Sequence, residues 1–179
     1  KQKGGKMIIE YCMTHFAVNP PTRANPSDAG LDIYYSPKTR IEKRIEPGES
    51  VLLETGLKFG VPHGYMLEVK NRSSVASKRQ LLVGACVIDS GYDGEVFINL
   101  HNVGLSTQLV EPGQKIAQIV MVPVVPFRAY CRHEDSLYDY PITMSERGAG
   151  ALGSTDDHQL GLPFDEEPTV DPYENLSLD

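Results

Sequence analysis

Short apolar runs of strand-forming residues recur along the chain, and turn-forming residues separate them at a spacing of roughly ten residues. The runs read MIIEYCM, LDIYY, SVLLETGLKFGV, YMLEVKN, QLLVGACVID, EVFINLHNV and KIAQIVMVPVV. Gly and Pro mark the turns, as in EPGES, VPHG, DSGYDG and EPGQ. This pattern predicts an all-β fold, an antiparallel sandwich or barrel. One short helix is expected over residues 73–80 (SSVASKRQ).

The size and composition of the chain suit one soluble domain. It has 179 residues, of which 40% are hydrophobic. Its apolar runs are too short or too interrupted to span a bilayer, and the N-terminus lacks the apolar core of a signal peptide. Cys12, Cys86 and Cys131 have neither the spacing of a zinc site nor that of a disulfide framework, which favours buried or half-buried free thiols. We therefore expect a cytoplasmic protein that does not bind a membrane.

The net charge of −7 arises in the C-terminal tail. Residues 156–179 contain eight acidic residues and no Lys or Arg, whereas the rest of the chain is nearly neutral. We expect a flexible N-terminus, a β-barrel domain, a glycine-rich closing arm and an acidic disordered tail, over residues 1–6, 7–146, 147–156 and 157–179. Basic residues form no concentrated patch with interleaved aromatics, which argues against direct binding of nucleic acid.

Several polar residues occupy positions that strand packing does not explain. Asp89 lies between an apolar run and a glycine-rich turn. In NRSSVASK, the residues Arg72, Ser73 and Ser74 follow a strand and precede the helix. This arrangement suits a phosphate, because a guanidinium, hydroxyls and backbone N–H groups converge there. The alternative is structural: a serine caps the helix and Arg72 makes a surface ion pair.

Two further segments have the composition of ligand-binding loops. DAGLDIY places Asp28 and Asp32 on either side of a glycine at a strand start. These carboxylates suit either a turn or hydrogen bonds to the water molecules of a hydrated Mg²⁺ ion. SERGAGALGSTDD suits either a linker or a loop that closes over an anion through Arg147, Ser154 and Thr155.

Taken in order, these segments resemble the five motifs of the trimeric dUTP pyrophosphatases (dUTPases). The motifs read DAGLDIY, NRSSVAS, VIDSGYDGE, EPGQKIAQIVMVPV and RGAGALGST, and the resemblance covers residues 7–156. It implies a jelly-roll-like β-barrel, a mobile C-terminal arm and a homotrimer whose three active sites are each built from more than one subunit. It also implies the hydrolysis of dUTP to dUMP and pyrophosphate, through attack of water on the α-phosphorus.

The resemblance assigns roles to single residues. Asp89 matches the catalytic aspartate that orients and deprotonates the water. Tyr92 matches the aromatic residue beneath the deoxyribose, and Asp32 would hold waters of a Mg²⁺ ion that the substrate chelates. The remaining substrate contacts are Arg72, Ser73, Ser74 and Gln118 in the barrel, and Arg147, Leu152, Gly153, Ser154 and Thr155 in the closing arm.

The sequence departs from the family pattern around the base. Leu152 stands where the family has an aromatic residue that stacks on uracil, Asp156 replaces a glycine, and Asp93 replaces a common arginine. Residues 78–89 form a slightly short segment without the asparagine that helps to read uracil. A related pyrophosphatase acting on dCTP, dTTP or a 5-substituted deoxyuridine triphosphate is therefore the alternative.

The dCTP deaminases share this fold and similar motifs, and they provide a further alternative. They need a glutamate, in the strand after the Asp89 turn, to shuttle protons at the base. Asn99 occupies that position, and an amide cannot act as an acid or a base. Ser77 stands where the second motif of the deaminases has an arginine. We therefore favour phosphate hydrolysis.

The tail contains the peptide QLGLPF, over residues 159–164, which looks like the Gln-Leu-x-Leu-x-Phe peptide by which bacterial replication proteins bind the sliding clamp. Gln159 with the apolar anchors Leu160, Leu162 and Phe164, in a disordered acidic segment, suits docking into a groove. The alternatives are packing on a neighbouring subunit and a non-catalytic clamp-binding module. The peptide implies the cytoplasm of a bacterium or of a phage-infected bacterial cell.

Overall fold

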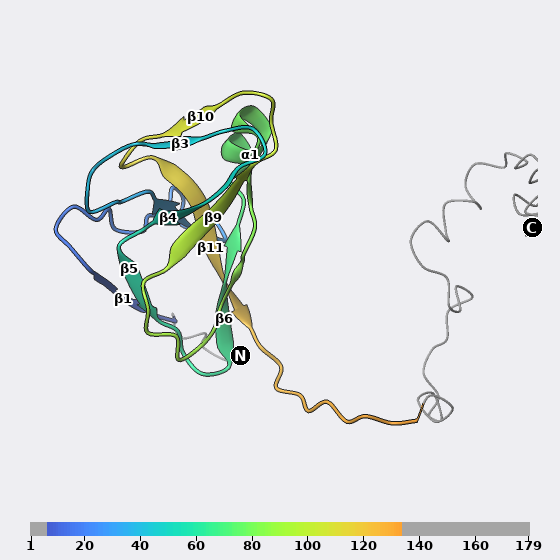
Figure 1. Cartoon of the computed structure of the whole chain (residues 1–179). Coiled ribbons are helices and arrows are strands. Elements are labelled where there is room, and N and C mark those ends of the chain that lie inside the picture. The colour runs from blue at the N-terminus through green and yellow to red at the C-terminus, as the bar shows by residue number, and fades with distance from the viewer. Residues whose placement is uncertain (1–6, 134–179) are drawn as a thin grey trace, which may run out of the picture. The chain divides into compact units, whose positions relative to one another are not determined.

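The computed structural model describes residues 7–133, which form strands and a single helix in the order shown in Figure 1. The helix is α1 (Ser73–Arg79). The strands are β1 (Glu10–Met13), β2 (Leu31–Tyr34), β3 (Lys43–Ile45), β4 (Ser50–Glu54), β5 (Leu57–Gly60), β6 (Tyr65–Lys70), β7 (Leu81–Val83), β8 (Val87–Ile88), β9 (Phe97–Asn102), β10 (Gln108–Val110) and β11 (Lys115–Pro123). The prediction of an all-β fold with one short helix is confirmed. A second unit begins at Ala129, and its described residues contain neither helix nor strand.

Two larger sheets and two strand pairs make up the first unit. The strand order is β2-β11-β6-β8 in one sheet and β4-β9-β7 in the other, and β1 pairs with β5 and β10 with β3. All pairings are antiparallel. The central strand β11 sets the position of one polar residue: Gln118 lies opposite Asp32 on β2 and opposite Lys70 on β6.

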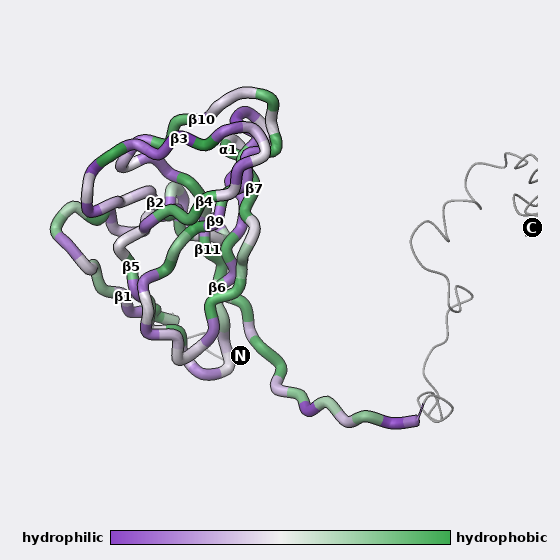
Figure 2. Tube along the Cα trace, viewed as in Figure 1, coloured by the Kyte–Doolittle hydropathy of each residue, from purple (hydrophilic) through white to green (hydrophobic). Residues whose placement is uncertain are grey.

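The alternation of buried and exposed side chains along the strands builds the core. In β4 the side chains of Val51 and Leu53 are buried while Leu52 between them is exposed. Strand β9 repeats the pattern with Ile98 and Leu100. Figure 2 shows where hydrophobic and hydrophilic segments lie along the tube. Because successive residues of a strand face opposite sides, each strand of these sheets has one face for the core and one for other contacts.

The helix ends one residue earlier than expected. Gln80 takes the left-handed conformation, with φ 53°, and its N–H donates to the carbonyl of Ala76. Arg72 is the N-cap residue and makes no side-chain capping bond. Neither serine caps the helix, so this part of the structural alternative is wrong. The three cysteines are free, as expected. Cys86 is half-buried, but Cys12 and Cys131 are exposed, so the expectation of buried or half-buried thiols is wrong for these two; Cys12 lies on β1, whose four residues are all exposed.

Candidate active site

Five of the predicted site residues line one pocket, which we call the arginine pocket. Strand β2 supplies Asp32, the connection after β6 supplies Arg72, α1 supplies Ser73 and Ser74, and β11 supplies Gln118. The pocket is completed by Ala24, Asp28 and Gly30. Three segments that lie far apart in the sequence therefore bring the predicted phosphate contacts together.

Asp32 connects two basic residues at this pocket. Its Oδ1 accepts a hydrogen bond from Arg72 Nε at 2.7 Å, and its Oδ2 accepts one from Lys115 Nζ at 2.7 Å. Only 13% of the Asp32 side chain is exposed, against 26% for Arg72 and 33% for Lys115. The ion pair of Arg72 is thus largely shielded from water, unlike the surface pair of the structural alternative.

Lys115 is a residue that the sequence interpretation missed. The hydrogen bond to Asp32 raises the pKa of Lys115, and the ammonium lies 5.7 Å from the centre of the Tyr34 ring. The only sequence signal is a lysine near the start of one strand and an aspartate near the start of another. The register shift between Lys115 and Ala117, which decides how these strands meet, cannot be read from the sequence.

Gln118 is held against the backbone of Gly30. Its Nε2 donates to the carbonyl of Asn71 at 2.9 Å. A β-carbon at Gly30 would lie 2.6 Å from Gln118 Oε1, which is closer than atoms approach without a shift. The hydroxyls of Ser73 and Ser74 are exposed at the pocket and make no hydrogen bond within residues 7–133. These two hydroxyls and the second N–H of Gln118 are available to a ligand.

Asp89 lies in a second pocket, which we call the aspartate pocket. Its lining combines Asp89, Tyr92 and Glu95 with an apolar surface made by Leu52, Val87, Ile88, Val96 and Phe97. The N–H of Tyr92 donates to the carbonyl of Asp89 at 3.3 Å and closes the turn between them. Glu95 anchors the end of this segment, because its Oε1 accepts the N–H of Gly56 at 2.9 Å. The carboxylate of Asp89 is exposed to this pocket.

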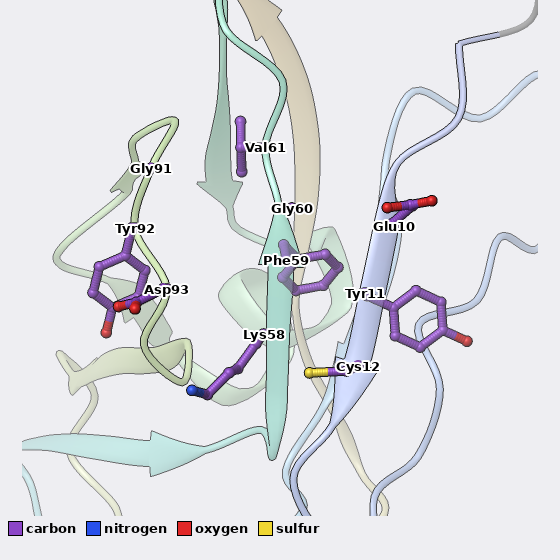
Figure 3. Close-up of a pocket in the computed structure, with 10 residues that line it drawn as sticks. All are labelled: Glu10, Tyr11, Cys12, Lys58, Phe59, Gly60, Val61, Gly91, Tyr92 and Asp93. Atoms are coloured by element: carbon purple, nitrogen blue, oxygen red, sulfur yellow. The ribbon is translucent and has the colours of Figure 1, made fainter.

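Tyr92 separates the aspartate pocket from a groove on its other side. Its hydroxyl donates to the carbonyl of Glu95 at 2.9 Å, which fixes the ring over the turn. Figure 3 shows the groove, with Tyr92 and Asp93 on one wall and strands β1 and β5 on the other. Lys58 extends from β5 toward the turn that carries Tyr92 and Asp93 (Figure 3).

The arginine pocket and the aspartate pocket share no lining residue. Within one chain, the predicted phosphate contacts of the barrel line the arginine pocket. The predicted catalytic residue Asp89 and the predicted sugar contact Tyr92 line the aspartate pocket. The other candidate residues lie outside the described residues; they are Arg147, Leu152, Gly153, Ser154, Thr155, Gln159, Leu160, Leu162 and Phe164. Within residues 7–133 no three His, Cys, Asp or Glu side chains gather as a metal site. The same part of the chain contains no helix long and apolar enough to cross a membrane.

Comparison with known proteins decides the family. The dUTPase family model matches residues 17–155. The chain belongs to the dUTPase family. Among curated dUTPases, the deoxyuridine 5'-triphosphate nucleotidohydrolase of Chlamydia pneumoniae is 36% identical over 149 residues, covering 81% of this chain and 96% of the relative. The corresponding protein of Chlamydia felis is 34% identical over 149 residues, with the same coverage.

Solved dUTPase structures have the same fold. A variant of the Staphylococcus bacteriophage 80alpha dUTPase, solved with dUpNHpp, matches with a TM-score of 0.69 and 25% identity. The match covers 82% of this chain and 97% of that one. The dUTPase from phage phi11 of S. aureus matches with a TM-score of 0.66 and 24% identity, over 72% of this chain and 97% of that one. The expected barrel of the dUTPase type is confirmed.

Proposed function

We propose that this enzyme of the dUTPase family hydrolyses dUTP to dUMP and pyrophosphate. The observation that carries the proposal is the convergence of Asp32, Arg72, Ser73, Ser74 and Gln118 in one pocket. That pocket offers a guanidinium, two hydroxyls and an amide to a chain of phosphates. The aspartate pocket offers a carboxylate beside a tyrosine, which suits a water-activating base and a sugar.

The chemistry is one displacement at phosphorus. Asp89 accepts a proton from water as the water oxygen bonds to the α-phosphorus, and the bond from that phosphorus to the bridging oxygen breaks to release pyrophosphate. Arg72 neutralises charge that develops on the phosphates. Because Asp32 accepts only the Nε–H of Arg72, the remaining N–H groups of the guanidinium are free to bind phosphate oxygens.

Members of this family generally use a divalent metal, and the residues here fit Mg²⁺ held by the substrate. Asp28 and Asp32 both line the arginine pocket, but Asp32 is paired with two cations and Asp28 accepts the N–H of Asn25 at 2.8 Å. These carboxylates suit contacts to metal-bound water rather than direct bonds to the metal. When bound, Mg²⁺ supplies charge neutralisation along the triphosphate.

Three further parts of the proposal concern assembly and the C-terminal region. The active chain is a homotrimer in which a site is completed by more than one subunit, and the separation of the two pockets supports this. Residues 147–156 close the site, with Arg147, Ser154 and Thr155 on the distal phosphates and Leu152 and Gly153 near the base. Beyond them residues 157–179 form a separate acidic tail.

The alternative substrates are nucleotides with another pyrimidine base. A pyrophosphatase acting on dCTP, dTTP or a 5-substituted deoxyuridine triphosphate would use the same pockets. Deamination of dCTP is disfavoured because Asn99, in place of the required glutamate, carries an amide that is already hydrogen bonded to Ser50 and His101.

The test is pyrophosphate release with Mg²⁺ from dUTP, dCTP, dTTP and UTP, with the nucleoside monophosphate product identified. The wild type should prefer dUTP. Asp89→Asn should lose roughly 10²–10⁴-fold in kcat, the range of general-base catalysis, while its affinity for dUTP is retained. Near-wild-type turnover by this variant would remove Asp89 from the mechanism, and no release from any nucleotide by the wild type would refute the function.

The tail peptide carries a second, independent proposal: residues 159–164 bind a bacterial sliding clamp. Its support is the sequence QLGLPF within an acidic segment. The full chain should bind an immobilised clamp, and the double change Leu162→Ala with Phe164→Ala should abolish that binding without altering pyrophosphate release. Equal binding by both proteins would refute the proposal.

A further inference from the structure

Three polar side chains gather on the outer face of the β4-β9-β7 sheet. Ser50 on β4 lies opposite His101 on β9, and Asn99 lies two residues before His101 on the same face. The Asn99 Nδ2 group donates to Ser50 Oγ at 2.9 Å and to the Val51 carbonyl at 3.3 Å. The Asn99 Oδ1 atom lies 2.8 Å from His101 Nε2. The amide of Asn99 is therefore held at both ends.

These bonds define where His101 carries its proton. A carbonyl oxygen can only accept a hydrogen bond, so the Asn99 side chain must direct its Nδ2 group toward the Val51 carbonyl. Its Oδ1 atom then faces the imidazole of His101. An amide oxygen also only accepts, so Nε2 of His101 must be protonated to make the bond. His101 is thus the donor that fixes the orientation of Asn99.

The backbone of Gly84 packs directly on this cluster. Its N–H donates to the backbone carbonyl of Asn99 at 3.0 Å. A β-carbon on Gly84 would lie 2.0 Å from Asn99 Oδ1 and 2.3 Å from His101 Nε2. Only glycine allows this approach, and it places the two side chains beneath the start of the 84–86 turn.

The 84–86 turn presents peptide groups that the protein does not use. Its flanks are tied down, because the Val83 N–H donates to Asn71 Oδ1 at 2.7 Å and the Cys86 carbonyl accepts the Val69 N–H at 2.7 Å. Between these bonds, the N–H and carbonyl of Ala85 make no hydrogen bond within residues 7–133. They are available to the polar edge of a ligand.

This turn lies beside the aspartate pocket. Leu52 is opposite Asn99 in the strand register, Phe97 precedes Asn99 on the same face, and Val87 follows the turn directly. All three apolar side chains line the pocket that contains Asp89 and Tyr92. A flat nucleobase placed over these apolar residues would have the 84–86 turn at its edge, because Val87 follows that turn directly.

We propose that Asn99 and His101 are positioning residues for base selection: with Ser50 they hold the 84–86 turn so that the Ala85 peptide groups read uracil. The inference rests on the proposed hydrolysis of dUTP. Uracil presents a donor at N3 between two acceptors, whereas cytosine presents an acceptor at N3 and a donor at its exocyclic amine. If the turn is held in one position, its peptide groups match the hydrogen-bonding pattern of uracil. Against cytosine the same groups are left without partners. The cluster compensates for the asparagine that residues 78–89 lack.

The test compares kcat and KM for dUTP and dCTP, using the full chain with Mg²⁺. Asn99→Ala should lower the preference in kcat/KM for dUTP over dCTP by about tenfold, mainly by raising KM for dUTP. Its kcat for dUTP should stay within about threefold, because Asp89 and the arginine pocket are unchanged. His101→Phe should show the same loss of preference. His101→Gln, whose amide N–H replaces the Nε2–H group, should retain it.

A matched control is Asn19→Ala, which removes a half-buried asparagine that lines neither pocket. An unchanged dUTP preference in folded Asn99→Ala would overturn the inference, as would equal losses in His101→Gln and His101→Phe. If Asn99→Ala does not fold, Ser50→Ala serves the same comparison, because it removes one acceptor of the Asn99 amide together with the 3.5 Å contact between Ser50 Oγ and His101 Nε2. Failure of the wild type to release pyrophosphate would instead overturn the proposed function, and this inference with it.

Discussion

Asp32 shows how one carboxylate can prepare a site for anions. Burying a carboxylate is costly unless it is paired, and here each oxygen has a cationic partner, Arg72 or Lys115. Asp32 and its two cationic partners together carry one positive charge, which the Asp28 carboxylate in the same pocket offsets, so the pairing orders the basic groups without adding net charge. The pairing also fixes the Arg72 guanidinium through Nε, so little reorganisation is needed when phosphate binds. The second carboxylate oxygen, held by Lys115, therefore helps to fix the orientation of Asp32 and, through it, of Arg72.

Replacing Lys115 tests this view of the pocket. Lys115→Met leaves one oxygen of Asp32 without a partner and frees the carboxylate to turn, which disturbs Arg72. We expect KM for dUTP to rise roughly tenfold, the effect of weakening one charge-assisted contact, while kcat changes little. Steady-state pyrophosphate release measures both constants. Lys38→Met, at an exposed lysine away from both pockets, is the control. An unchanged KM in Lys115→Met would show that Arg72 does not depend on this bond.

The pKa of Lys115 gives the pH range over which this pair acts. The hydrogen bond to Asp32 raises the pKa above the ordinary lysine value. A group with a raised pKa in the folded state contributes its full stability below the unfolded value and loses it as the pH rises through the folded value. The pair is therefore intact at neutral pH, and its contribution is lost only in strongly alkaline solution.

At the scale of elements, β9 connects the active-site side of the barrel to the core. Its outer face carries Asn99 and His101, and its last residue, Asn102, is 1% exposed. Asn102 Nδ2 donates to the carbonyls of Ile45 and Ser106 at 3.0 and 2.9 Å, and its Oδ1 accepts the Gly104 N–H at 3.0 Å. One buried amide thus joins β9 to β3 and to the loop that follows.

Removing this amide should destabilise the fold. Asn102→Ala removes the hydrogen-bond partner of the buried Ile45 carbonyl, of the buried Gly104 N–H and of the part-buried Ser106 carbonyl, at a cost of roughly 2–4 kcal/mol in the free energy of unfolding. Urea denaturation at a fixed protomer concentration measures the loss. Asn19→Ala, whose side chain makes no hydrogen bond within residues 7–133, should change stability by less than about 1 kcal/mol. Similar losses in the two variants would contradict the role of Asn102.

The elements were more predictable than the contacts between them. Short apolar runs separated by Gly and Pro turns define strands locally, and the helix at Ser73–Arg79 differs from the expected range by one residue. The pairing of Asp32 with Lys115 depends on a register shift in β11. The sequence shows that Asn99 is an amide, but its contact with Gly84 requires the turn to fold back over β9. The pattern of residues within one segment carries no information on contacts between segments that lie far apart in the sequence.

At the scale of the whole molecule, the arginine pocket and the aspartate pocket share no lining residue, which supports the proposal that a complete site needs more than one chain. Asp89 and Tyr92 line one pocket, and Arg72 lines the other, with no shared residue. The reaction requires a base and phosphate contacts on the same substrate. In the homotrimer that we propose, the aspartate pocket of one subunit would face the arginine pocket of the next.

Mixing two inactive variants tests the shared site directly. Asp89→Asn and Arg72→Ala should each be nearly inactive alone. If they are unfolded together in equal amounts and refolded, a shared site takes Asp89 and Arg72 from different chains, each intact with a probability of one half. About a quarter of the sites should then be complete, so the mixture should recover about a quarter of the wild-type pyrophosphate release. Proteins refolded separately and then combined are the control. If the base and the phosphate contacts came from the same chain, no chain in the mixture would have both, and co-refolding would recover nothing.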